Sequence, residues 1–131
     1  MHRNRMALSL ALIVVGSTIA VAAEHTKDSL DTVKKNLKEK QAILIDVREE
    51  PEWKDGHLQD ARLVPLSKLR DAEKQAAATK ELPKDKIIYC HCAAGRRSLE
   101  AGDLLKKQGF DVRPLKPGYK DLLNAGFPKA P

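Results

Sequence analysis

Apolar positions recur along this chain with spacings typical first of a helix and then of strands. Leu30, Val33 and Leu37 fall on one helical face, which predicts an amphipathic helix to about Lys40 with Ser29 as its N-cap. Residues 42–47 then form a nearly continuous apolar run, typical of a strand buried on both faces of a parallel sheet.

The rest of the chain repeats this alternation. Further strands are expected at residues 61–64, 86–91 and 112–115, and helical segments at residues 51–55, 68–79, 97–108 and 119–125. Ser67 is expected to cap the second of these helices, and Gly109 to end the third. Strands that alternate with helices predict an α/β fold, here a small doubly wound parallel sheet flanked by helices.

The first 23 residues have the pattern of a secretory signal peptide. Two arginines precede an apolar stretch over residues 6–21, and the small residues Ala22 and Ala23 offer a cleavage site before Glu24. We therefore expect a signal peptide at 1–23 and one domain at 24–131, exported to the periplasm and free of the membrane after cleavage. The apolar stretch also overlaps the lower end of transmembrane lengths, about 17–25 residues, so an uncleaved anchor is the alternative.

Charge adds little to this picture. The net charge of +6 falls to +4 once the two leader arginines are removed, and basic residues alternate with acidic ones, as in residues 34–40. Aromatic residues make up only 4% of the chain, so few could stack on bases, and we expect no nucleic-acid partner.

The two cysteines, Cys90 and Cys92, are separated by one residue. Because a disulfide stabilises more when it closes a longer loop, these sulfurs are expected to serve chemistry rather than structure. Residues two apart in a strand have Cα atoms about 6.4–6.8 Å apart, the upper limit for a disulfide. We expect Cys90 to be a core residue, with a redox role as the alternative.

Cys92 stands where a predicted buried strand gives way to a helix, which is where active sites lie in open α/β sheets. Small residues and a glycine after it let backbone amides turn inward as an anion-binding nest, and the helix adds its positive end. This environment favours the nucleophilic thiolate, so Cys92 is the predicted catalytic residue. The predicted substrate-binding residues are those that follow it: Ala93, Ala94, Gly95, Arg96, Arg97 and Ser98.

These residues resemble the rhodanese domains, whose active loop has the form Cys-x-x-Gly-x-Arg-Ser. Residues 46–49 and 56–61 resemble the family's Asp-Val-Arg-Glu and Gly-His-Ile-x-Gly-Ala signatures, and residues 117–119 and 126–128 are similar to its Gly-Gly-Trp and Gly-x-Pro close. The likeness extends over residues 30–128. Three positions depart from the pattern: Asp60 and Pro117 replace glycines, and Cys90 replaces an ordinary strand residue.

The resemblance implies a sulfurtransferase of the thiosulfate:cyanide type that works through a persulfide on Cys92, without a dissociable cofactor. Its expected partners are a small anionic sulfur donor such as thiosulfate and a thiol or cyanide acceptor, a protein thiol included. Asp46 and Arg48 are expected to hold loops together. The alternative is a non-enzymatic rhodanese-like module that senses redox state or binds a partner.

Two other kinds of site fit less well. Cysteine phosphatases carry five residues between cysteine and arginine, whereas four separate Cys92 from Arg97. A metal site would need His91 beside both cysteines, but in a strand it points away from them, and His57 is expected to be structural. We therefore predict no metal.

Overall fold

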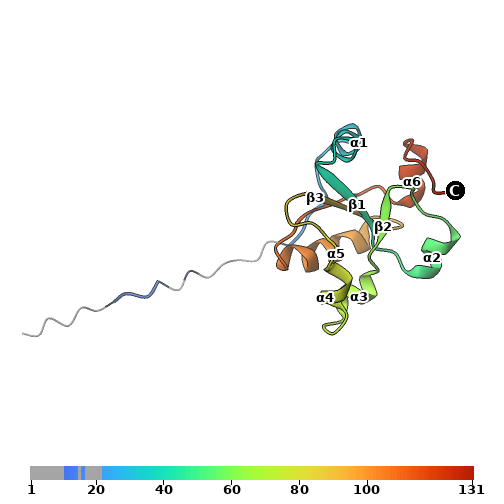
Figure 1. The fold of residues 1–131 in the computed structure, drawn as a ribbon. Coiled ribbons are helices and arrows are strands. Elements are labelled where there is room, and N and C mark those ends of the chain that lie inside the picture. The colour runs from blue at the N-terminus through green and yellow to red at the C-terminus, as the bar shows by residue number, and fades with distance from the viewer. Residues whose placement is uncertain (1–10, 15, 17–21) are drawn as a thin grey trace, which may run out of the picture.

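The computed structural model describes residues 11–14, 16 and 22–131 (Figure 1). The predicted signal peptide falls mostly on residues outside these ranges. No helix among the described residues is long and apolar enough to cross a membrane.

Four parallel strands form the central sheet, in the order β2-β1-β3-β4. Their bounds are Ala42–Asp46 for β1, Ala61–Leu63 for β2, Ile87–His91 for β3 and Asp111–Pro114 for β4. β1 and β3 are central and buried along most of their length, as their apolar sequences predict. The predicted α/β fold with a doubly wound parallel sheet is confirmed.

Helices cover both faces of the sheet (Figure 1). α1 (Leu30–Lys38) and α6 (Tyr119–Asn124) contribute to one apolar core, and α3 (Leu66–Arg70) and α5 (Arg96–Lys107) to the other. Ser29 caps α1 as predicted, its Oγ accepting from the amide of Thr32 at 3.1 Å. The short helix α2 (Glu50–Asp55) follows β1.

One predicted helix is wrong in its extent. The segment expected to be helical over residues 68–79 is two helices, α3 and α4 (Gln75–Thr79), separated by a turn. Asp71 causes the break, because its Oδ1 accepts from the amide of Glu73 at 2.9 Å. Ser67 lies within α3 and not at its cap, which is Pro65.

Alternating side chains of the central strands divide the interior into two cores. Ile45, Ile88 and Cys90 pack on the side of α3 and α5, and Leu44 and Tyr89 pack on the side of α1 and α6. Packing on both faces fixes the register of β1 and β3, and therefore the place where the chain leaves β3.

Candidate active site

The cysteine loop, residues 92–98, connects the carboxyl end of β3 to α5. β3 ends at His91, and α5 begins at Arg96. Gly95 is the helix N-cap with φ 88° and ψ −12°, a left-handed conformation that favours glycine. The loop therefore brings Cys92 to the positive end of a 12-residue helix.

The Cys92 sulfur lies at the bottom of this loop. The amide of Gly95 donates to Cys92 Sγ at 3.0 Å, a contact that is stronger when the sulfur is a thiolate. Cys92 is only 1% exposed, whereas Ala93 and Ala94 are exposed at the rim. One amide of the predicted nest, that of Gly95, thus contacts the predicted nucleophile.

The segment at residues 118–119, at the start of α6, packs against the cysteine loop. The amide of Tyr119 donates to the Cys92 carbonyl at 2.9 Å. Gly118 packs so closely on the loop that a Cβ there would lie 1.7 Å from Ala93 O. The Gly118 backbone (φ −90°) is open to any residue, so the close approach alone requires glycine.

The three polar residues of the loop differ in their roles. Arg96 is exposed at the surface of the protein. Ser98 is fully buried, and its hydroxyl lies 2.8 Å from the carbonyl oxygen of Gly95 and 3.1 Å from that of Leu115, which share its single proton. The structure thus places the Ser98 hydroxyl in the loop's own framework.

Arg97 forms a bidentate ion pair with Glu52 of α2, at 2.6 and 2.8 Å. This hydrogen-bonded pair lowers the pKa of Glu52 to about 2. Sequence analysis missed Glu52, because only the fold brings α2 beside the cysteine loop.

Asp46 and Arg48 brace neighbouring loops, as predicted. Arg48 donates to both Asp46 carboxylate oxygens and to Gly56 O, and its guanidinium lies 4.3 Å from the centre of the Tyr119 ring. The pair is buried and links the end of β1 to the start of α6. His57 also has a structural contact, with Nδ1 2.9 Å from Trp53 O.

Cys90 and His91 are the last two residues of β3, and both are fully buried. Cys90 Sγ donates to Ser98 O at 3.4 Å, and complete burial raises the pKa of its thiol. Both cysteines are free thiols. Burial lowers the pKa of His91, whose Nε2 lies 3.7 Å from Asp46 Oδ2.

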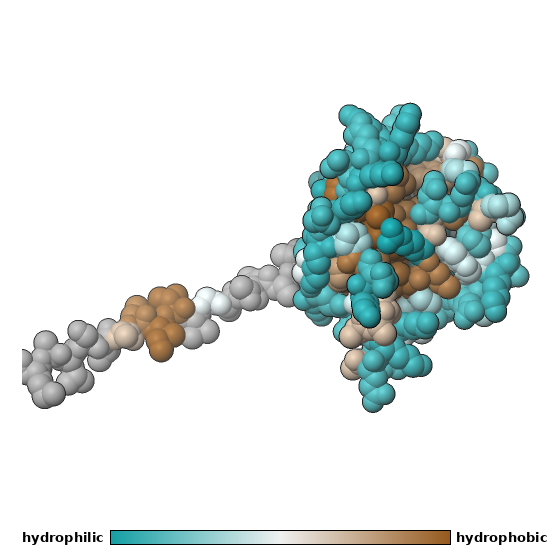
Figure 2. Space-filling view, in the orientation of Figure 1, coloured by the Kyte–Doolittle hydropathy of each residue, from teal (hydrophilic) through white to brown (hydrophobic). Residues whose placement is uncertain are grey.

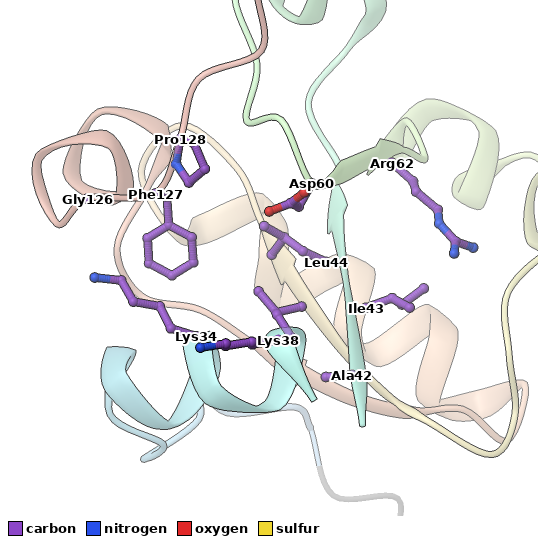
Figure 3. Close-up of a pocket in the computed structure, with 11 residues that line it drawn as sticks. Lys34, Lys38, Ala42, Ile43, Leu44, Asp60, Arg62, Gly126, Phe127 and Pro128 are labelled. Carbon is purple, nitrogen blue, oxygen red and sulfur yellow. The ribbon is translucent and has the colours of Figure 1, made fainter. Parts of the chain in front are cut away.

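A separate hollow of about 500 Å³ lies near the start of β1, between α1 and residues 126–128 (Figure 3). Lys34 and Lys38 line one side of the hollow and Phe127 lines the other, and none of the predicted site residues contributes to it.

On the face drawn in Figure 2, apolar surface gathers in the middle of the domain and is surrounded by polar surface. Within the described part of the chain, no cluster of three His, Cys, Asp or Glu residues could hold a metal ion.

Comparison with known proteins finds one family whose model matches most of the domain. The model of the Rhodanese-like domain family matches residues 29–125, which include the whole sheet and the cysteine loop. The chain belongs to the rhodanese-like domain family. The resemblance drawn from the sequence motifs is thereby confirmed.

Proteins similar to this chain include one named as uncharacterized and two named as sulfurtransferases. The chain is 38% identical over 82 residues to the uncharacterized protein YqhL of Bacillus subtilis, covering 62% of this chain and 60% of that protein. It is 37% identical over 95 residues to the probable adenylyltransferase/sulfurtransferase MoeZ of Mycobacterium tuberculosis, covering 72% of this chain but 21% of MoeZ. The human single-domain sulfurtransferase TSTD1 superposes with a TM-score of 0.62 at 26% identity, covering 79% of this chain and 96% of TSTD1.

Proposed function

We propose that this rhodanese-like domain transfers sulfane sulfur from thiosulfate or a similar anion to a thiol or cyanide, through a persulfide on Cys92. The observation that carries the proposal is the hydrogen bond from the Gly95 amide to Cys92 Sγ at the N-terminus of α5. The names of MoeZ and TSTD1, both called sulfurtransferases, support the same class of reaction.

In the first step, the Cys92 thiolate attacks the outer sulfur of thiosulfate. A bond forms between Cys92 Sγ and that sulfur while the sulfur–sulfur bond of thiosulfate breaks, and sulfite leaves with the electron pair. The product is a Cys92 persulfide anion. Loop amides and Arg96 would stabilise its charge, because donors aimed at a developing anion act strongly in a water-poor site.

In the second step, cyanide or an acceptor thiolate attacks the outer sulfur of the persulfide. Thiocyanate or a new persulfide leaves, and the Cys92 thiolate is regenerated with no net redox change. The exposed rim formed by Ala93 and Ala94 supports access by a protein thiol, since these side chains are small. No dissociable cofactor takes part in either step.

The reaction is tested by measuring thiocyanate formed from thiosulfate and cyanide. We expect turnover by the wild type and none by Cys92→Ser, which keeps the size of the side chain but lacks the thiolate. Equal rates in the two proteins would remove Cys92 from the mechanism. Absence of transfer from every sulfane donor would favour the binding or redox-sensing module instead.

The same preparations are assayed with a phosphate ester. Four residues between Cys92 and Arg97 make a smaller ring of amides than the phosphatase loop, and Arg97 is already paired with Glu52. We expect no hydrolysis. Turnover of the ester that depends on Cys92 would contradict the size argument.

We also propose that the protein is exported, with residues 1–23 removed as a signal peptide. The apolar stretch and the small residues before Glu24 support this assignment. The thiosulfate donor and the acceptor would then be met in the periplasm.

A further inference from the structure

Residues 24–29, here called the N-terminal strap, extend from the cysteine loop along the β4 side of the sheet to the start of α1. The amide of Thr26 donates to Pro114 O at 2.8 Å. Asp28 Oδ2 accepts from Tyr89 Oη at 2.6 Å and from Arg113 at 2.9 Å. The strap is therefore anchored at two points before α1 begins.

The anchored strap brings His25 to the cysteine loop. His25 Nε2 lies 2.7 Å from Gly95 O, and a carbonyl oxygen only accepts, so Nε2 carries the proton that it donates. The hydroxyl of Ser98 donates to the same carbonyl at 2.8 Å. Two donors from different segments thus hold one peptide group.

That carbonyl belongs to the residue whose own N–H contacts the sulfur, and the two groups lie in neighbouring peptide planes that meet at Gly95 Cα. The Gly95 N–H donates to Cys92 Sγ, and the left-handed φ of 88° aims it there. Glycine is conformationally free, so its orientation depends on what holds its own polar groups. Without His25, the Gly95 carbonyl would lose the donor that comes from the strap and keep those of its own helix, and the Gly95 amide would be less firmly directed at the sulfur.

We propose that His25 is a positioning residue of the sulfur-transfer site, acting on Cys92 through the Gly95 peptide. The inference rests on the proposed function for its kinetic consequence, but the positioning itself is measurable without turnover. It extends the site to a residue that lies 70 positions away in the sequence.

The test compares three substitutions in the full chain. His25→Gln places an amide nitrogen four bonds from Cα, as Nε2 is in histidine, and therefore keeps a donor at the same reach. His25→Asn places its nitrogen one bond nearer to Cα, and His25→Ala has no donor. We expect kcat/KM for sulfur transfer to fall about 2- to 10-fold in the Ala and Asn variants, the loss of one hydrogen bond, and to recover in the Gln variant.

Hydrogen exchange of the Gly95 amide, followed by NMR, gives a readout that does not depend on activity. Exchange should be faster in His25→Ala and His25→Asn than in the wild type, and close to wild type in His25→Gln. Lys27→Ala, an exposed neighbour in the strap, is the matched control and should change neither measurement.

The outcomes separate the two proposals. If the wild type transfers no sulfur but the Gly95 amide follows the expected order, the proposed function fails and the positioning role stands. If sulfur transfer is present and all three His25 variants match the wild type in rate and exchange, the positioning role is overturned. A Gln variant as impaired as the Ala variant in both measurements would also overturn it, since the donor would then not be what matters.

Discussion

Gly118 shows how one residue controls the shape of the cysteine loop. Its Cα packs against the Ala93 peptide, and a Cβ would lie 1.7 Å from Ala93 O and 2.9 Å from Ala94 N. Real Cβ atoms do not approach other atoms so closely, so a larger residue at position 118 must displace the loop.

Gly118→Ala is accordingly expected to destabilise the fold by about 1–3 kcal/mol through overpacking, and to lower sulfur transfer at least tenfold by moving the Cys92 amide nest. Gly109→Ala is the matched control. Gly109 has φ 89°, but a Cβ there would meet only the end of Lys84 at 3.4 Å. The control should lose about 1–2 kcal/mol from backbone strain while keeping its activity. Full activity in Gly118→Ala would show that the loop tolerates displacement.

Cys90 presents the opposite case, a cysteine of β3 that lies two residues before Cys92 and that we expect the chemistry not to require. It is fully buried, with a thiol whose pKa is raised by burial, and therefore a poor nucleophile. We expect Cys90→Ala to keep most sulfur transfer and to lose about 1 kcal/mol of stability from the missing sulfur, measured by urea unfolding. If the substitution abolishes turnover, and oxidation of the monomer removes both free thiols, Cys90 is a resolving cysteine.

Among individual residues, those that could be predicted from the sequence act together with residues close to them in the sequence. Cys92 and Gly95 are three residues apart, so their motif carries the geometry. His25 and Glu52 contact the loop from 70 and 45 positions away. These contacts follow from packing, and nothing in the local sequence around either residue marks it.

Helix α2 connects the end of β1 to the cysteine loop. Glu52 accepts from the amide of Glu49 at 3.2 Å and forms the bidentate pair with Arg97 of α5. The carboxylate of Glu49 in turn accepts from the amide of Ser67 at 3.3 Å, which ties α2 to α3. Carboxylates of α2 thus connect three helices around the site.

The low pKa of Glu52 makes this connection sensitive to acid. Its pKa falls from 4.5 to about 2 on folding, so its ionised form stabilises the fold above about pH 4.5, and that contribution is lost as pH falls toward 2. We expect Glu52→Gln to lower the unfolding free energy at neutral pH, with the difference from wild type vanishing near pH 2.

Glu50→Gln is the control for this measurement. Glu50 pairs with Lys54 on the surface, with both side chains more than 60% exposed, and such pairs contribute little. Its unfolding free energy should match the wild type throughout. A Glu52→Gln variant with the wild-type acid profile would show that the ion pair with Arg97 does not couple to folding.

Helices and strands were predictable where burial of one or both faces imposes a regular spacing of apolar residues along the sequence. β1 and β3 are buried on both faces, and their apolar runs predicted them. The apolar face of α1 and its N-cap Ser29 predicted that helix. The break between α3 and α4 was missed because an alanine-rich segment has high helix propensity, and the turn at Asp71 depends on one side-chain hydrogen bond.

The whole molecule combines the rhodanese-like domain with the predicted leader. If the leader is a signal peptide, the exported protein begins at Glu24, and intact-mass analysis of the periplasmic fraction should find that mass. Ala23→Trp places a large residue at the cleavage site and should leave the leader attached. A wild-type protein that keeps Met1 and stays in the cytoplasm would contradict the assignment.

The sheet has two short edges, and this bears on how the protein behaves when crowded. β2 has only three residues, with exposed Arg62 at its centre. At the other edge, β4 ends at Pro114, whose carbonyl accepts from Thr26 of the strap. Long, bare strand edges act as templates for fibrillar aggregation, whereas short, charged or covered ones do not. Native chains should therefore stay dispersed at high concentration, because each edge strand is at most four residues long and offers a neighbouring chain few peptide groups to pair with.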